Sequence, residues 1–187
     1  MRLISLDDLL PLEEFNLQRK ELFEQQQKYL ERFRRVKLGT EFTLIFENRQ
    51  TLIFRLQEIL RVARLTDPGK IHRELAVFNR LIPAQNILQA SLLVEQGLVK
   101  TLGPLQGNYL RFEIGKHSLP GDLVTARPED MAVGTSFWVQ FAFTAEQGKA
   151  LGGEEAKAEV ILRWGSNPLA SQSLSLEMRQ ALALDLE

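Results

Sequence analysis

The apolar pattern of this sequence changes character near residue 85, and that change limits the folds open to the chain. Before this point, apolar residues recur at intervals of three, four and seven, as in amphipathic helices. After it, short runs rich in β-branched and aromatic residues are separated by Gly, Pro and Asn, as in strands joined by turns. Helices that precede strands predict an α+β fold with a mainly antiparallel sheet and short capping helices, rather than alternating βα units. We expect a single domain over residues 1–187, helix-rich over 1–85 and strand-rich over 86–187, because two halves with a short Pro-containing join favour a shared core.

The first half is predicted to hold one long helix followed by a buried strand. The helix begins at Pro11 and runs to about Leu38, where Gly39 stops it. The buried strand covers residues 41–46. Other helices are expected over 5–8, 53–63, 71–81, 145–151 and 176–184, with Thr144 and Ser175 as N-caps of the last two. Further strands are expected within the ranges 87–96, 109–117, 121–127, 135–143 and 157–164.

The composition excludes several classes of function. The sequence has no cysteine and therefore no disulfide, thiolate zinc site, Cys-ligated cluster or cysteine nucleophile. Its 23 basic and 24 acidic residues give a net charge of −1, so no global field attracts nucleic acid or anionic membrane. No signal peptide is evident, and no run reaches the ~20 apolar residues of a membrane span. We expect a cytoplasmic protein without a membrane anchor and, since no nucleotide motif occurs, without a cofactor.

The best candidate for a site is the unit over residues 38–64, where a buried strand turns abruptly into a charged amphipathic helix. Polar groups at the end of a buried strand need hydrogen-bond partners. Arginine suits bidentate recognition of carboxylates and anions, so the unit predicts a site for such a ligand. The candidate residues are Glu47, Asn48, Arg49, Arg55, Glu58 and Arg61. Two other interpretations stay open: a surface ladder of Glu58 with Arg55 and Arg61 at helical spacing, and capping of the strand end.

Two hypotheses for function follow from these residues. The first is a non-enzymatic accessory protein that binds a protein partner or a small ligand at this unit. The second is a metal-dependent or hydrolytic enzyme, which requires carboxylates and a histidine to converge in one pocket. Its candidates are Glu13, Glu14, Glu47, Glu58, His72 and His117. No Glu is followed three residues later by His, and neither histidine has a second ligand at metal-binding spacing, so we assign no catalytic and no metal residue.

Two further features bear on partners. The basic run over residues 32–37 is placed in the last turn of the long helix, where basic residues are expected, and no aromatic platform for bases lies nearby, which disfavours nucleic-acid binding. Trp138 is predicted on the opposite face of its strand from Phe137 and Phe141, so it either packs under a helix or marks an exposed partner surface. Homodimerisation through the long helix is a third interpretation.

Several segments resemble an uncharacterised family of bacterial proteins of about this length. They are SLDDLLPLEEF, RRVKLGTEFTLIFENRQT, LQEILR and IHRELAVFNRLIP, with the Phe-Glu-Asn motif at 46–48 and Leu-Ser-Leu-Glu at 174–177. The resemblance covers essentially the whole chain and is strongest over residues 5–83. It implies no catalytic role. Genes of the family tend to lie near those for rubrerythrin-like and iron–sulfur oxidoreductase proteins, which implies an accessory role in an oxidative-stress or iron-related context.

Overall fold

The computed structural model of the protein describes residues 2–94, 109–124, 137–164 and 167–187. Its helical elements are η1 (Leu6–Asp8), α1 (Leu12–Phe33), α2 (Arg49–Val62), α3 (Pro68–Arg80), α4 (Ala145–Gly152) and α5 (Leu176–Asp185). Its strands are β1 (Arg35–Leu38), β2 (Phe42–Glu47), β3 (Ile87–Val94), β4 (Leu110–Ile114), β5 (His117–Pro120), β6 (Asp122–Val124), β7 (Phe137–Ala142), β8 (Ala158–Trp164) and β9 (Asn167–Ser173). Among the described helices, none combines the length and the apolar character that a membrane span needs.

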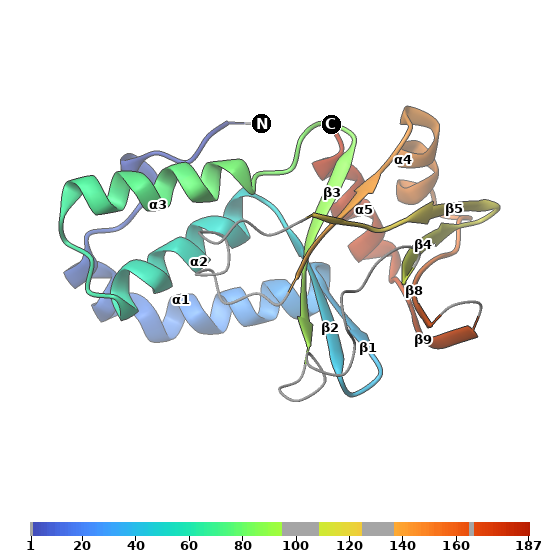
Figure 1. Cartoon of the computed structure of the whole chain (residues 1–187), viewed down its shortest axis with the longest axis horizontal. Coiled ribbons are helices and arrows are strands. Elements are labelled where there is room, and N and C mark those ends of the chain that lie inside the picture. The colour runs from blue at the N-terminus through green and yellow to red at the C-terminus, as the bar shows by residue number, and fades with distance from the viewer. Residues whose placement is uncertain (1, 95–108, 125–136, 165–166) are drawn as a thin grey trace.

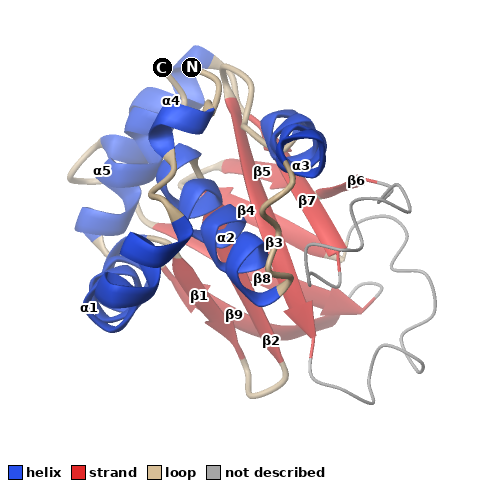
Figure 2. Ribbon diagram, turned by 90° about the vertical axis from the view of Figure 1, so that its left-hand side faces the viewer, coloured by secondary structure: helices blue, strands red, loops and turns tan. Residues whose placement is uncertain are grey.

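The strands form two antiparallel sheets. Sheet A has the order β1-β2-β3-β7-β6, and sheet B has the order β5-β4-β8-β9. Figures 1 and 2 show α1, α2 and α3 together on one side of sheet A, whereas sheet B lies on the other side with α4 and α5. The predicted α+β class, with a long N-terminal helix and mainly antiparallel strands, is confirmed.

Strand β2 shows why sheet A is covered on both faces. Leu44 and Phe46 are buried between the sheets, where they join Phe112 of β4 and Phe141 of β7 in one apolar core. The Phe112 and Phe141 rings pack edge to face with centroids 5.6 Å apart, and Phe46 meets Phe112 in the same way at 5.9 Å. Glu47, one residue further, points to the opposite face because successive strand residues alternate. The side chain of this carboxylate therefore lies on the helix side of the sheet.

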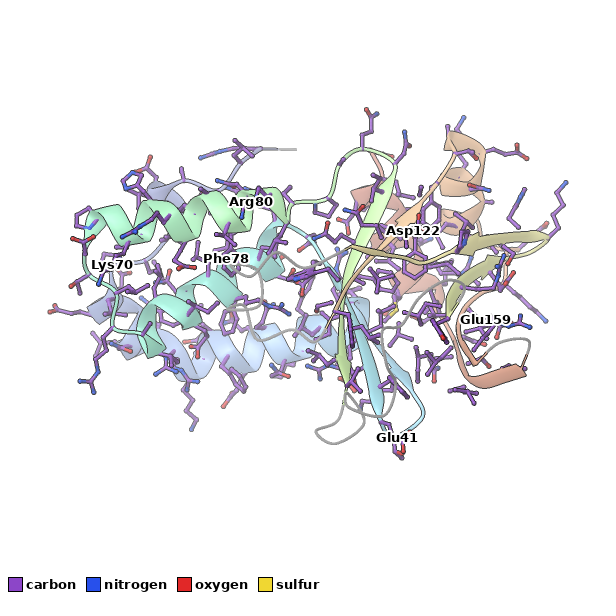
Figure 3. All side chains as sticks on the ribbon, in the orientation of Figure 1. Glu41, Lys70, Phe78, Arg80, Asp122 and Glu159 are labelled. Atoms are coloured by element: carbon purple, nitrogen blue, oxygen red, sulfur yellow. The ribbon has the colours of Figure 1, made fainter. Side chains whose placement is uncertain are left out.

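A second apolar core fills the space between sheet A and the helices. It contains Leu52 and Leu56 of α2, Phe78 of α3 and Trp138 of β7. Figure 3 shows Phe78 on the side of α3 that faces α2. Trp138 is 2% exposed, so it packs under the helices rather than on an open sheet face.

The predicted extent of the long helix is wrong at its C-terminal end. Helix α1 ends at Phe33, and Arg35–Leu38 forms β1, which pairs with β2 in a hairpin. Val36 and Leu38 are buried and alternate with less buried residues, which is the pattern of a strand. Gly39 has a φ of 69°, a backbone conformation that glycine adopts readily, and it serves the hairpin rather than a helix end.

The other predicted helices form, and their starts have clear physical causes. Thr144 and Ser175 each accept a hydrogen bond from the backbone N–H three residues later, at 3.2 Å in both cases, so both predicted N-caps are confirmed. Helix α3 begins at Pro68, three residues before the predicted start, because Asp67 caps it. Asp67 is thus the N-cap of α3, and Pro68 is its first helical residue.

The sequence pattern missed strand β9 (Asn167–Ser173). This strand is short of β-branched and aromatic residues and contains Pro168, which a strand tolerates at the edge of a sheet. It occupies the edge of sheet B beside β8, which satisfies that condition. Of the predicted strand ranges, residues 95–96, 125–127 and 135–136 lie outside the described residues.

We expect Phe112→Ala to lower the free energy of unfolding by about 3–5 kcal/mol, because Phe112 is fully buried and the cavity left behind would be enclosed by other rings. Urea denaturation followed by circular dichroism measures this loss. The matched control is Phe23→Ala on α1, where the ring is 40% exposed and the expected loss is about 1 kcal/mol or less. Equal losses for the two variants would contradict the two-sheet core.

Candidate functional site

The hinge between β2 and α2 positions the candidate site. Asn48 is the N-cap of α2: its Oδ1 accepts a hydrogen bond from the backbone N–H of Thr51 at 3.1 Å, and its own N–H donates to Thr51 Oγ1 at 2.9 Å. This reciprocal pair satisfies two backbone groups that a helix start leaves free. The chain therefore turns at once from strand to helix, and α2 passes over the carboxylate of Glu47.

The Glu47 carboxylate is buried and held from three directions. Glu47 is 2% exposed. Thr51 Oγ1 donates to Oε2 at 2.5 Å, Ser91 Oγ of β3 donates to Oε1 at 2.7 Å, and Arg55 Nη2 lies 2.6 Å from Oε1. The Arg55 guanidinium also lies over the Trp138 ring, 5.5 Å from its centroid. A buried carboxylate is tolerated when an opposite charge and hydrogen bonds compensate it. Here Arg55 supplies the charge, and Thr51 and Ser91 supply the hydrogen bonds.

Glu47 lies at the wall of a cavity of about 210 Å³ between α1, α2 and β2, which we call the Glu47 cavity. Three of the predicted residues, Glu47, Arg55 and Glu58, line it. Helix α1, which was not part of the predicted site, supplies the opposite wall. The complete lining is Gln26, Gln27, Leu30, Ile45, Glu47, Thr51, Phe54, Arg55 and Glu58.

Gln26 is the polar residue of this wall whose hydrogen-bonding capacity is unused. It is 6% exposed, and within the described part of the chain its carboxamide makes no hydrogen bond. Its neighbours differ: Gln25 donates to Glu21 at 3.0 Å, and Gln27 accepts from Arg35 at 2.8 Å. The Gln26 amide atoms are not among the fully buried polar atoms that lack a partner, so they are accessible from the cavity and open to a ligand or to water.

The predicted arginines are already paired with carboxylates of the same chain. Arg49 lies 2.5 Å from Asp8, and Arg55 lies 2.6 Å from Glu47. Arg61 lies 2.9 Å from Glu58, as the predicted helical ladder requires, and Arg19 of α1 lies 2.9 Å from the same carboxylate. Arg55 pairs with Glu47 at the hinge. Each of these arginines has a carboxylate partner within the chain, and an anion would have to compete with that partner.

These pairs shift the pKa of two carboxyl groups. The Arg49 side chain, followed by the backbone of Ser5, hydrogen-bonds Asp8 and holds the pKa of its carboxyl well below the usual value. Burial acts to raise the pKa of the Glu58 carboxyl, but hydrogen bonds from Arg61 and Arg19 outweigh it and lower that pKa. Both carboxylates are therefore charged at neutral pH and hold their helices together.

Asn48 and Arg49 face a different cavity from Glu47. This cavity, of about 440 Å³, is lined by Asn48, Arg49, Gln50, Ile53 and Asp185. Behind it, Asn48 Nδ2 donates to Tyr29 Oη at 2.9 Å, and Arg34 Nε donates to the same oxygen at 2.9 Å. Arg34 also pairs with Asp185 of α5, where burial raises the pKa of the carboxyl against the opposing effect of Arg34. Five of the six predicted residues are thus divided between two cavities, and Arg61 lines neither.

Of the residues of the enzyme hypothesis, Glu47 and Glu58 share the Glu47 cavity, but the other four are not among its lining residues. Glu13 and Glu14 are exposed in the first turn of α1. His72 is exposed on α3, where its Nδ1 lies 2.8 Å from the carbonyl oxygen of Pro68, and His117 lies on β5 in sheet B. Across the four described ranges, no three His, Asp or Glu side chains form a group that could hold a metal ion.

The basic run at the end of α1 is paired as well. Arg32 lies 2.7 Å from Glu177 of α5, while Arg35 and Lys37 lie 2.7 Å and 3.2 Å from Glu31. These contacts join α1 to α5 and to β1. Glu177 and Glu31 thereby offset part of the positive charge of this run.

Sequence reasoning missed Gln26 and Ser91. Both carried a weak signal: Gln26 stands midway between Leu22 and Leu30 in the apolar stripe of α1, and Ser91 interrupts an apolar strand. A polar residue at a position of the core pattern is a candidate for a buried polar role.

The fold is an α+β protein in which a helix layer and a second sheet cover the two faces of a central antiparallel sheet, with a small cavity on the helix side. The chain belongs to the family described as Protein of unknown function (DUF3501), whose model matches residues 3–186. A crystal structure of a protein of unknown function from Burkholderia pseudomallei K96243 has the same fold, with a TM-score of 0.85 and 20% identity over 100% of each chain. No curated protein matches the sequence.

We expect Glu47→Gln to lower the free energy of unfolding by about 3 kcal/mol, because it removes the buried charge that faces Arg55. Urea denaturation of Glu47→Gln, Arg55→Met and the double variant measures the coupling free energy between the two side chains. The double variant should lose less than the sum of the single losses. Strict additivity of the two losses would contradict a coupled pair. The matched control is Glu13→Gln at an exposed position, which should change the free energy of unfolding by less than about 0.5 kcal/mol.

The Asp8–Arg49 pair predicts a pH-dependent contribution to stability. Because the pKa of folded Asp8 lies below its ordinary value of 3.8, the ionised form stabilises the fold above that pH, and the contribution disappears as the pH falls further. Wild type should therefore be more stable than Asp8→Asn at pH 7, and the difference should shrink below about pH 4. Urea titrations from pH 7 to pH 2.5 measure it, and a constant difference over this range would contradict the assignment.

Proposed function

We propose that this protein is a non-enzymatic accessory protein of the cytosol that binds a small, neutral, polar molecule in the Glu47 cavity. The observation that supports this most directly is Gln26, a buried residue that lines the cavity and whose accessible carboxamide makes no hydrogen bond within the described residues. A carboxamide both donates and accepts, so a ligand with an amide or hydroxyl group satisfies it.

The charges around the cavity favour a neutral ligand over an ion. Glu47 is compensated by Arg55, and Glu58 by Arg19 and Arg61. An anion would have to compete with Glu47 and Glu58 for arginines that are already paired, and a cation would approach a set with one more arginine than carboxylate. A neutral head group needs only the hydrogen bonds that Gln26 and the carboxylate oxygens offer.

We extend the proposal to a biological setting. The resemblance of the sequence to its family, whose genes tend to neighbour those of rubrerythrin-like and iron–sulfur oxidoreductase proteins, supports an accessory role in oxidative stress or iron metabolism. The Glu47 cavity would then sense or carry a small metabolite for that process.

Acetamide is a suitable probe because it presents one primary amide and little else. We expect it to bind the full-length ¹⁵N-labelled protein with a dissociation constant on the order of 10 mM, since so small a ligand has few atoms to contribute. NMR titration should shift the side-chain amide signals of Gln26 and the backbone signals of Thr51 and Arg55.

Gln26→Leu provides the specific test. It keeps the size of the side chain and removes the carboxamide, so we expect a fold of normal or raised stability and at least a tenfold loss of acetamide affinity. The matched control is Gln18→Leu, on the same helix but exposed, which should bind as wild type does. Unchanged binding by Gln26→Leu, or shifts in wild type that avoid the cavity, would overturn the proposal.

A further inference from the structure

A second cavity adjoins the first, between the N-terminal part of α1 and the outer face of α2. It has a volume of about 250 Å³, and we call it the Phe15 cavity. Its lining is Asp8, Leu10, Phe15, Leu22, Gln25, Gln26, Gln50, Ile53, Phe54 and Gln57. The apolar side chains come from both helices and from the segment before α1.

Two residues line both cavities. Gln26 of α1 and Phe54 of α2 border both spaces, so a ligand that occupies both would pass these two side chains. The Phe54 ring packs edge to face against Phe15 with centroids 6.1 Å apart, and it meets Phe23 at 6.4 Å. Each cavity alone lies below the ~300 Å³ at which ligand pockets usually begin, whereas the two together lie within that range.

Two polar residues of the Phe15 cavity already have hydrogen-bond partners. Gln57 bonds the backbone of Leu10 in both directions, each at 2.9 Å. Asp8 is bonded by Ser5 and paired with Arg49. Besides the carboxamides of Gln26 and of the exposed Gln50, for which no partner is found among the described residues, this cavity offers apolar surface from Phe15, Leu22, Ile53 and Phe54.

We propose that the ligand is amphipathic, with a neutral hydrogen-bonding head at Gln26 in the Glu47 cavity and a short hydrocarbon chain in the Phe15 cavity. The inference rests on the proposed function and gives the chemical class of its ligand. The head satisfies the Gln26 carboxamide, for which the described residues supply no partner, and the chain covers the apolar side chains beside it. Unbranched primary amides or alcohols of a few carbons have this chemistry.

A homologous series of primary amides tests the chain. Acetamide, butanamide and hexanamide have the same head and differ only in the number of methylenes. We expect isothermal titration calorimetry and NMR on the full-length protein to show affinity rising roughly three- to fourfold for each methylene that enters the Phe15 cavity. NMR shifts should extend from Gln26 to Leu22 and Ile53 as the chain lengthens. This measurement needs no variant.

A variant that fills only the Phe15 cavity gives the second test. Leu22 lines this cavity and not the Glu47 cavity, so Leu22→Trp should leave acetamide affinity within twofold and abolish the gain with chain length. The matched control is Leu17→Trp, on the same helix at an 88% exposed position, which should retain the full gain. Thermal unfolding of both variants checks that they fold.

The outcomes separate the two proposals. Acetamide that binds at Gln26 without any gain from butanamide or hexanamide would overturn the amphipathic ligand and leave the proposed function standing. A gain that Leu22→Trp does not reduce would overturn it as well. Hexanamide binding that Gln26→Leu does not weaken would overturn the head-group assignment in both proposals, and a series in which no member binds would overturn both.

Discussion

Strands β2 and β3 have no face that is open to water. Leu44 and Phe46 lie against sheet B, while the alternate residues of these strands lie under the helices. Any polar side chain on the helix-facing side must therefore find its hydrogen bonds inside the protein. Glu47 and Ser91 do so with each other and with Arg55, and this requirement fixes how α2 crosses the sheet.

The cavities depend on polar bridges between the helices. Arg19 joins α1 to Glu58 of α2, and Tyr29 of α1 bonds the Asn48 cap at the start of α2. Bridges of this kind fix the distance between two helices, whereas a continuous apolar seam would let them close on each other. Arg34 extends the same network to α5, so the wall of the Glu47 cavity is tied to the C-terminal helix.

Local signals in the sequence predicted most of the fold. Helix caps such as Thr144 and Ser175 act within four residues, and the apolar spacing of α2 and α3 is visible in any short window. The end of α1 was mispredicted because residues 34–37 combine a basic composition, which suits the last turn of a helix, with the alternation of a strand. Pairing with β2, a tertiary interaction, decides in favour of the strand.

The candidate site was predictable only in the part that local sequence signals define. The unit from Glu47 to Arg61 is continuous in sequence, so its polar residues could be grouped without a structure. Ser91, 44 residues from Glu47, and the wall formed by α1 come into contact only through the sheet and the helix packing. The anion site predicted from the arginines assumed free charges, and only the fold reveals that Asp8 and Glu58 neutralise them.

Gln26 is the position at which stability alone does not account for the sequence. Leu22 and Leu30, one turn before and after it, lie on the same stripe of α1, and a leucine between them would bury apolar surface without an unbonded amide. The carboxamide atoms of Gln26 are not among the fully buried polar atoms that lack a partner, so they remain accessible from the cavity. Departures from the local pattern are expected at functional sites, where a ligand supplies the missing partner. An accessible amide at a core position of α1 therefore supports the proposed ligand site in the Glu47 cavity.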